Sequence, residues 1–197
     1  MNYCFIFAFK IVSKLKNEVT IGCNRIYLFD KVTPKYYCLE DKRLFKQIVK
    51  DLEAWDAKET IKFIPKALAF EARKMENVCL INFVYQDYVG GSPNFSEDLS
   101  KICYWGSTVV YMMLELAYYL GCNPIYLIGM DGVRPNRPKH FYSRDSIKEN
   151  PARHEFSDAA LIKVKKFFDS KGIKIYNATR DPVRNFFKRI DYKEIFK

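Results

Sequence analysis

The stretch STVVYMMLELAYYLGCNPIYLIGMD, residues 107–131, contains the strongest fold signals of the chain. Its first half places apolar residues three and four positions apart, which is typical of a helix that packs one apolar stripe against a core. Gly121 and the turn after it end this helix. Residues 125–129 are almost wholly apolar, as expected of a strand covered on both faces in a parallel sheet. The stretch therefore predicts a helix that leads into a central strand.

Both ends of this stretch carry groups suited to a ligand. Ligands of open α/β sheets bind beyond the carboxyl ends of the strands, so Asp131 and the loop after it form one predicted site. At the other end, Gly106, Ser107 and Thr108 combine a glycine, two hydroxyls and the backbone N–H groups of a helix start. Such a start can bind an anion, but the same residues also make an ordinary helix cap.

Strand and helix signals alternate along the rest of the chain, which favours a sheet built from βαβ units. The signals predict strands at 3–9, 19–24, 36–39, 60–64, 78–85 and 173–176, and helices at 42–55, 65–75 and 155–170, the last of which Gly172 ends. Residues 86–104 have a loop-like composition. We therefore predict one α/β domain over 1–197, with a Rossmann-like, mostly parallel sheet and flanking helices.

Residues 132–153 form the most unusual segment of the sequence. It holds three prolines and six basic residues and has no apolar periodicity, so we interpret it as a lid or loop. His140 and Tyr142 lie inside it, and His154 opens the helix that follows. Neutral imidazole can accept a proton near pH 7, so these histidines are candidate general bases, although a single histidine is more often structural.

The composition indicates which binding partners and which cellular compartment to expect. The chain has 33 basic and 23 acidic residues among 197, a net charge of +10, which favours an anionic partner: a nucleotide, a nucleic acid or an anionic membrane surface. Its six cysteines include no C-x-x-C pair and have no histidine at metal-site spacing, so we expect reduced, core-packing thiols in a cytoplasmic protein. No G-x-x-x-x-G-K-[ST], G-x-G-x-x-G, G-x-S-x-G or D-x-D motif is present.

The two ends of the chain each leave an alternative open. The apolar run at 3–9 is too short to span a bilayer, and we interpret it as a strand rather than a signal peptide or membrane anchor. The tail from residue 180 is basic and carries the aromatic pair Phe186 and Phe187. We expect it to pack these rings on the domain; the alternative is peripheral contact with the inner membrane or with nucleic acid.

Five segments together resemble a known family. They are 21–28, 36–41, 107–131, 140–142 and 173–179, and in this order they resemble the bacterial proteins of domain-of-unknown-function family 115, which occur among capsule and lipopolysaccharide genes. The layout is also similar to glycosyltransferase family 42, the bacterial sialyltransferases. The resemblance covers residue 14 to the C-terminus. It implies a single Rossmann-like domain of the GT-A-variant type with a lid.

The resemblance also implies an activity: transfer from a CMP-activated sugar to an oligosaccharide acceptor, without a metal or a cofactor. Asn24 matches an asparagine at the donor nucleotide, and 106–108 fall close to a Ser-Gly pair at the start of the central helix. His154 matches the proposed general base, Tyr142 a lid tyrosine that steadies the departing phosphate, and His140 a His-Phe pattern of unsettled role. A nucleic-acid partner is not implied, and a homo-oligomer is left open.

One departure from both families motivates a second hypothesis. Their first strand runs into a Gly-Asn-Gly-Pro-Ser loop that holds the nucleotide, and this chain has no such loop. The chain could therefore be a degenerate, non-catalytic remnant that binds a nucleotide or a partner glycosyltransferase. A third hypothesis is pyrophosphoryl transfer to a pterin, because an archaeal pterin pyrophosphokinase resembles this family; that chemistry needs Mg²⁺ and ATP.

Overall fold

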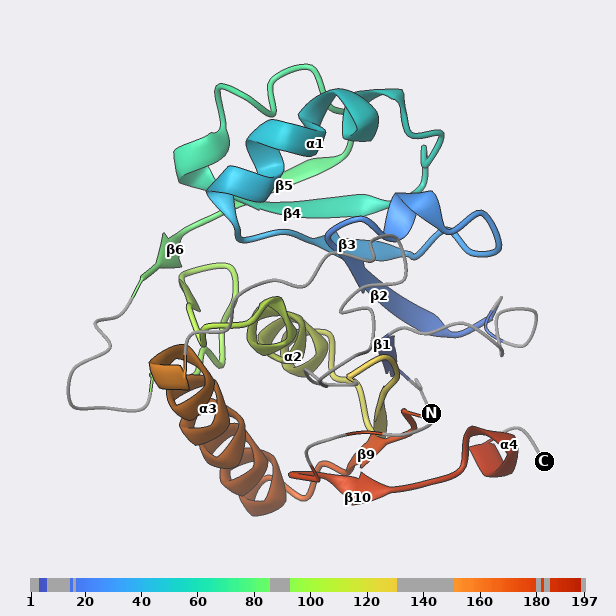
Figure 1. Ribbon diagram of the computed structural model, residues 1–197, viewed down its shortest axis with the longest axis vertical. Helices are drawn as coiled ribbons and strands as arrows, with labels where there is room; N and C mark the ends of the chain where they lie inside the picture. The colour runs from blue at the N-terminus through green and yellow to red at the C-terminus, as the bar shows by residue number, and fades with distance from the viewer. Residues whose placement is uncertain are drawn as a thin grey trace.

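The computed structural model describes residues 4–6, 15, 17–85, 93–130, 151–179, 182 and 185–195. Within these residues, eight strands form one sheet in the order β10-β9-β8-β1-β2-β3-β4-β5, and every neighbouring pair is parallel (Figure 1). The strands are β1 (Cys4–Ile6), β2 (Val19–Cys23), β3 (Tyr36–Cys38), β4 (Ile61–Pro65), β5 (Val78–Ile81), β8 (Ile125–Leu127), β9 (Ile175–Asn177) and β10 (Lys188–Arg189). The predicted α/β class with a Rossmann-like parallel sheet is confirmed.

Shorter elements and helices complete the described chain. A second, two-stranded parallel sheet pairs β6 (Phe83–Val84) with β7 (Cys103–Tyr104). The α-helices are α1 (Lys42–Ala54), α2 (Val109–Tyr119), α3 (Pro151–Ser170) and α4 (Tyr192–Ile195), and the 3-10 helices are η2 (Ile26–Leu28) and η3 (Lys66–Leu68). Figure 1 shows α1 on one side of β3 and β4 and α2 on the other side.

Helices α2 and α3 cover one face of the main sheet. Ile21 of β2 and Leu127 of β8 belong to the same buried cluster as Met112 of α2 and Phe168 of α3. Sequence periodicity predicted one apolar stripe on α2, and this is wrong: Val109 and 111–117 are all buried. The helix is enclosed almost all round because the 93–104 segment and α3 pack on the sides that the sheet leaves uncovered.

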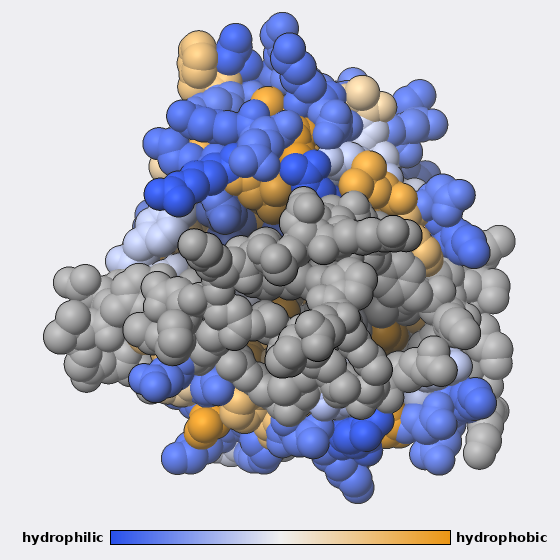
Figure 2. Space-filling view, in the orientation of Figure 1, coloured by the Kyte–Doolittle hydropathy of each residue, from blue (hydrophilic) through white to orange (hydrophobic). Residues whose placement is uncertain are grey.

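The opposite face of the sheet is covered by α1 and, further along, by the C-terminal segment. Phe45, Ile48 and Leu52 of α1 pack on Tyr37 and Ile64 of the sheet. The surface over α1 is mostly hydrophilic (Figure 2), as expected of a helix with a single buried stripe. A smaller cluster covers the β8 and β9 end of this face; its members are Leu15, Tyr126, Ile128 and Ala178, with Ile190, Tyr192 and Ile195 packed against it.

The C-terminal aromatic pair packs on the domain, as predicted. Phe187 is buried in the cluster beneath α2 and α3, and Phe186 is half-buried against it. Beyond this pair the chain adds two elements that the sequence did not predict, β10 and α4. The predicted last strand at 173–176 is therefore not the last, and β9 begins at Ile175 rather than 173.

Three further boundaries are corrected by the structure. Pro65 does not open a helix: it ends β4, paired with Ile81, and 66–75 form η3 and turns rather than the predicted helix. The predicted strand at 78–85 is divided into β5 and β6, and β5 is half exposed because it is the edge of the sheet. Helix α3 begins at Pro151 instead of 155, so 151–153 of the predicted lid are helical, and 131–150 lie outside the described residues.

Predicted caps set the helix ends correctly. Thr108 is the N-cap of α2, and its side chain accepts a hydrogen bond from the Val110 N–H. Gly121 and Gly172 follow α2 and α3 with φ of +69°, a left-handed conformation that favours glycine. Both helices then lead into the amino ends of strands, β8 and β9 respectively, so both helices begin at the carboxyl edge of the sheet.

The packing of α3 gives a test of the fold. Phe168 is 1% exposed among aromatic rings, whereas Ile162 of the same helix is 42% exposed. We expect Phe168→Ala to lower the free energy of unfolding by about 3–5 kcal/mol and Ile162→Ala to lower it by less than about 1 kcal/mol. Urea denaturation of the two variants measures this, and equal losses would contradict the described packing.

Candidate functional site at the carboxyl edge

The order of strands locates the expected ligand site. Strand β1 lies between β2 and β8, and the chain continues from it to β5 on one side and to β10 on the other. This is a topological switch point, and ligands of such sheets bind beyond the carboxyl ends of the strands next to it. We use carboxyl edge for the ends of β1, β2, β3, β8 and β9 together with the first turns of α2 and α3.

The structure brings several predicted site residues to this edge. Asn24 directly follows β2, 106–108 directly precede α2, and His154 lies in the first turn of α3. Only the backbone of His154 is described. Asp131, His140 and Tyr142 lie outside the described residues, and their predicted roles stay predictions.

Trp105 joins the elements of the carboxyl edge. Its Nε1 donates to Oε1 of the buried Glu40, just after β3, at 3.2 Å. Its ring stacks on Phe156 of α3, with centroids 5.8 Å apart and planes at 28°. We call Glu40, Trp105 and Phe156 the Trp105 bridge; it ties the start of α2 both to the end of β3 and to the second turn of α3.

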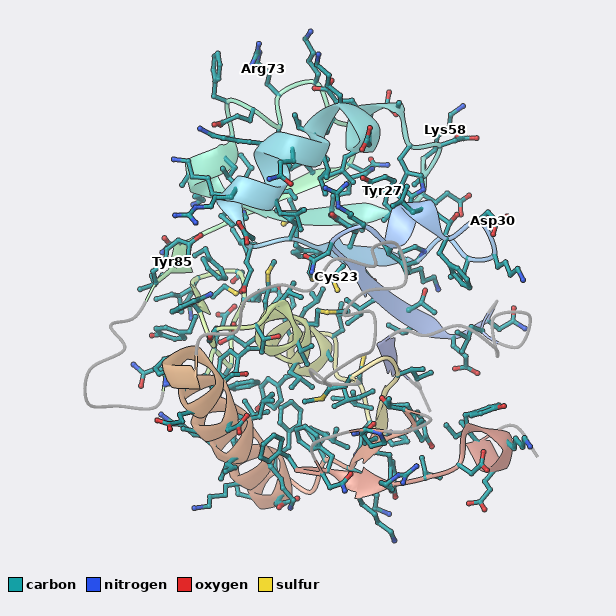
Figure 3. All side chains as sticks on the ribbon, viewed as in Figure 1. Cys23, Tyr27, Asp30, Lys58, Arg73 and Tyr85 are labelled. Carbon is teal, nitrogen blue, oxygen red and sulfur yellow. The ribbon has the colours of Figure 1, made fainter. Side chains whose placement is uncertain are left out.

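Tyr85 adds a further contact to this bridge. Its hydroxyl donates to the backbone oxygen of Glu40 at 3.0 Å, and its ring lies 5.9 Å from that of Trp105. Figure 3 shows Tyr85 beside β6, on the same side of the molecule as the beginning of α3. Burial, followed by the negative charge of Glu40, raises the pKa of Tyr85, so the hydroxyl stays protonated as a donor.

The residues before α2 already have structural roles. A Cβ on Gly106 would overlap the ring of Tyr111, so only glycine fits there. Ser107 is buried with φ of +66°, and the Thr108 hydroxyl caps the helix. Their predicted contact with a donor nucleotide stays a prediction, and these internal contacts account for the Gly-Ser-Thr sequence without it.

Glu115 is a buried carboxylate that the sequence reasoning missed. It is 0% exposed and accepts hydrogen bonds from the Ser96 N–H at 2.7 Å, the Tyr104 N–H at 3.0 Å and the Cys103 Sγ at 3.0 Å. Burial raises its pKa to about 8, against the opposing effect of these donors. The available signal was a single acidic residue inside the apolar run VVYMMLELAYY. Glu115 holds the 94–104 segment on α2.

A fixed cation lies next to Asn24. Arg25 donates from Nη1 to the Tyr27 hydroxyl at 3.2 Å and from Nη2 to Gln47 Oε1 at 3.4 Å, and Tyr27 in turn donates to Asp51 at 2.7 Å. Burial, followed by the hydrogen bond to Asp51, raises the pKa of Tyr27 to about 12. Figure 3 shows Tyr27 on the α1 side of the sheet. The guanidinium therefore adds positive charge to the α1 side of the β2 end.

Asn24 itself has φ of +53°, and its backbone oxygen accepts a hydrogen bond from the buried Tyr37 hydroxyl at 2.7 Å. Its carboxamide makes no hydrogen bond within the described part of the chain. The backbone of Asn24 is thus anchored while its side chain is available for a ligand. This arrangement fits the predicted donor-binding role without testing it.

The cysteines at this edge are packed thiols. Cys23 and Cys38 are register partners on β2 and β3, and Figure 3 shows Cys23 between β2 and α2. Burial, followed by the charge of Glu40, raises the pKa of Cys23 to about 12, and burial also raises the pKa values of Cys38 and Cys103. These thiols stay protonated at neutral pH and are poor nucleophiles.

Across the ranges of the chain that the structure describes, no group of three or more His, Cys, Asp and Glu side chains is arranged to hold a metal ion. Within the same ranges, no helix combines the length and the apolar composition needed to cross a membrane.

The fold and the edge define a Rossmann-like α/β protein with polar side chains gathered at the switch point of its sheet. Comparison of the chain with family models, curated proteins and solved structures found no match. The family resemblance of the sequence segments therefore remains a prediction.

The raised pKa of Glu115 predicts how stability changes with pH. The folded protein keeps a proton on this carboxyl up to about pH 8, whereas the unfolded chain releases it near the ordinary value of 4.5. Raising the pH through this window therefore favours unfolding, by at most about 1.4 kcal/mol per pH unit. Glu115→Gln cannot titrate, so its stability relative to the wild type should rise from pH 5 to pH 8.

Urea denaturation of the wild type and Glu115→Gln at pH 5, 6.5 and 8 measures this difference. A constant offset is expected from the changed hydrogen bonds, so the evidence is the slope with pH. Glu53→Gln on the exposed side of α1 makes the same chemical change outside the core. If the unfolding free energy of Glu115→Gln relative to the wild type does not change with pH, or falls as the pH rises, the raised pKa of Glu115 is refuted.

The Trp105 bridge predicts an asymmetry between the two tryptophans. Trp105→Phe keeps an aromatic ring but removes the N–H donor to buried Glu40, so we expect a loss of about 1–3 kcal/mol in unfolding free energy. Trp55→Phe is the matched control, because Trp55 contacts Tyr27 and Tyr37 through its ring. Hydrogen exchange should also accelerate at 155–158 in Trp105→Phe alone; equal effects in both variants would argue against the bridge.

Proposed function

We propose that this protein transfers a sugar from a CMP-activated donor to an oligosaccharide acceptor in surface-polysaccharide or lipooligosaccharide synthesis. The observation that carries the proposal is the Trp105 bridge, which holds the start of α2 against the first turns of α3. Gly106, Ser107 and Thr108 adjoin this bridge on one helix, and His154 is two residues before Phe156 on the other. Asn24 reaches the same edge from β2.

The chemistry follows from these positions. His154 accepts the proton of an acceptor hydroxyl, the hydroxyl oxygen forms a bond to the anomeric carbon, and the bond from that carbon to the CMP phosphate breaks with its electron pair leaving on the phosphate. The positive ends of the α2 and α3 helix dipoles favour the negative charge that develops on the departing phosphate. The guanidinium of Arg25 adds a fixed positive charge on the α1 side.

A second candidate function is nucleotide or partner binding without turnover. Two observations favour it: Tyr111 fills the space beside Gly106, and the Thr108 hydroxyl caps α2. Gly106 and Thr108, which fall in the family's donor-site pattern, thus already have structural roles. In addition, the chain has no Gly-Asn-Gly-Pro-Ser loop. In this case the carboxyl edge binds CMP but lacks the geometry for transfer.

Release of CMP from CMP-sialic acid in the presence of an oligosaccharide acceptor tests the leading proposal. We expect His154→Ala to reduce the turnover number by roughly 10²–10⁴-fold, because general-base assistance is lost, while its melting temperature stays close to that of the wild type. Lys166→Ala, on an exposed position of the same helix, is the control and should keep wild-type turnover.

The outcomes separate the two candidates. No CMP release by the wild type, or full activity of His154→Ala, would rule out the proposed transferase. A rise in melting temperature with CMP, without any release from the sugar nucleotide, supports the binding function instead.

A further inference from the structure

Asn177 is a buried polar residue at the carboxyl edge. It is the last residue of β9 and is 0% exposed. Its register partner is Leu127 of β8, which lies in the cluster under α2 and α3. Paired residues of parallel strands point to the same face, so the Asn177 side chain lies on the face that the first turns of α2 and α3 cover.

One half of the Asn177 carboxamide has a partner and the other half has none. Oδ1 accepts the Thr179 N–H at 3.0 Å, and this donor fixes which way the amide faces. Nδ2 is buried and has no acceptor among the described residues. An unpaired buried donor is unfavourable by about 1–3 kcal/mol, and native proteins seldom keep one without a reason.

Thr179 provides a second buried donor beside the first. It is 2% exposed, and its Oγ1 accepts the Met130 N–H at 3.0 Å. A hydroxyl that accepts in this way still has its own proton to donate, and no acceptor for that proton occurs in the described part of the chain. The two donors thus stand at the end of β9, next to the end of β8.

The donor pair lies at the same edge of the sheet as Asn24. Strands β9 and β2 are separated by β8 and β1, so Asn177 and the end of β2 lie about 14 Å apart across three strand spacings. The donor pair and Asn24 therefore flank the switch point from opposite sides. The helix starts on this face and the excess of basic residues both favour an anionic occupant.

We propose that Asn177 Nδ2 and Thr179 Oγ1 form a subsite that binds an anionic oxygen of the donor substrate. The inference rests on the proposed function for the identity of that substrate. Two sources share this chemistry: the phosphate of CMP and the carboxylate of the sialic acid. Binding supplies the acceptor that the buried carboxamide lacks.

Isothermal titration calorimetry with CMP, free N-acetylneuraminate and inorganic phosphate tests the subsite. Asn177→Asp keeps the oxygen that accepts from Thr179 but removes the Nδ2 donor and adds negative charge. We expect this substitution to weaken binding about 10- to 100-fold for each probe that carries the anionic group bound by the subsite. Weaker binding of CMP and inorganic phosphate identifies the phosphate as the bound group. Weaker binding of N-acetylneuraminate alone identifies the carboxylate.

The matched control is Asn123→Asp. Asn123 lies before β8 at the opposite edge of the sheet, and its Oδ1 likewise accepts a backbone N–H, that of Lys174 at 3.1 Å. Its variant makes the same chemical change and should bind the probes within about twofold of the wild type. Thr179→Val, which adds no charge, is a second variant in case Asn177→Asp does not fold, and we expect it to weaken binding about threefold to tenfold.

The inference is overturned if both site variants bind like the control, or if the wild type binds none of the three probes. Failure of the proposed function is seen separately. Weakened probe binding by Asn177→Asp, combined with no CMP release by the wild type, retains the subsite and removes the transferase. Wild-type probe binding by Asn177→Asp, combined with His154-dependent CMP release, removes the subsite alone.

Discussion

The hydrogen bond between Trp105 and the buried carboxylate of Glu40 joins the two halves of this protein. Glu40 belongs to the half of the sheet from β2 to β5, and Trp105 leads into α2, which feeds β8 and the other half. A carboxylate inside a protein requires donors, so Glu40 constrains where Trp105 can lie. Phe156 then stacks on that tryptophan and fixes the start of α3.

A second buried acidic residue, Glu115, constrains the same region. Glu115 of α2 accepts hydrogen bonds from the backbone N–H groups of Ser96 and Tyr104, and Glu40 accepts one from Trp105, so the segment that leads into α2 is held at both ends. Position 106 must be glycine because Tyr111 fills the space where a side chain would lie. The start of α2 is therefore built by the protein interior before any ligand arrives, which is the kind of preorganisation that an electrostatic binding edge requires.

Sequence patterns correctly predicted the elements that depend on residues close together in the chain. Apolar runs located β2, β3 and β8, periodicity located α1, and Thr108, Gly121 and Gly172 set helix ends, because each signal acts over a few residues. Features decided by distant contacts were missed. Pro65 is compatible with the first turn of a helix, and only its pairing with Ile81 shows that it ends a strand. The two charged residues of β10 carry no strand signal at all.

The same contrast between local signals and distant contacts applies to the candidate site. Alternating strand and helix signals predicted a parallel sheet with a ligand site at the carboxyl ends of its strands, and the family resemblance assigned Asn24 and 106–108 to that site. The strand order that makes β1 the switch point was not predicted. Glu115 and Asn177 could not be given roles, because a polar residue becomes informative only when its burial and its missing or satisfied partners are known. Of the predicted lid, only 151–153 are described, as the first turn of α3.

The pairing of β1 with β8 has a consequence for how the chain reaches this fold. Strands β2 to β5 are neighbours both along the chain and in the sheet, so residues 19–81 can assemble from contacts of short range. Strand β1 precedes them all, yet one of its two partners begins at Ile125, over a hundred residues later. During synthesis, one side of β1 therefore stays unpaired until the ribosome has released β8, and completion of the switch point is a late, slow event. The switch point at which we place ligand binding is thus completed only after β8 has joined β1.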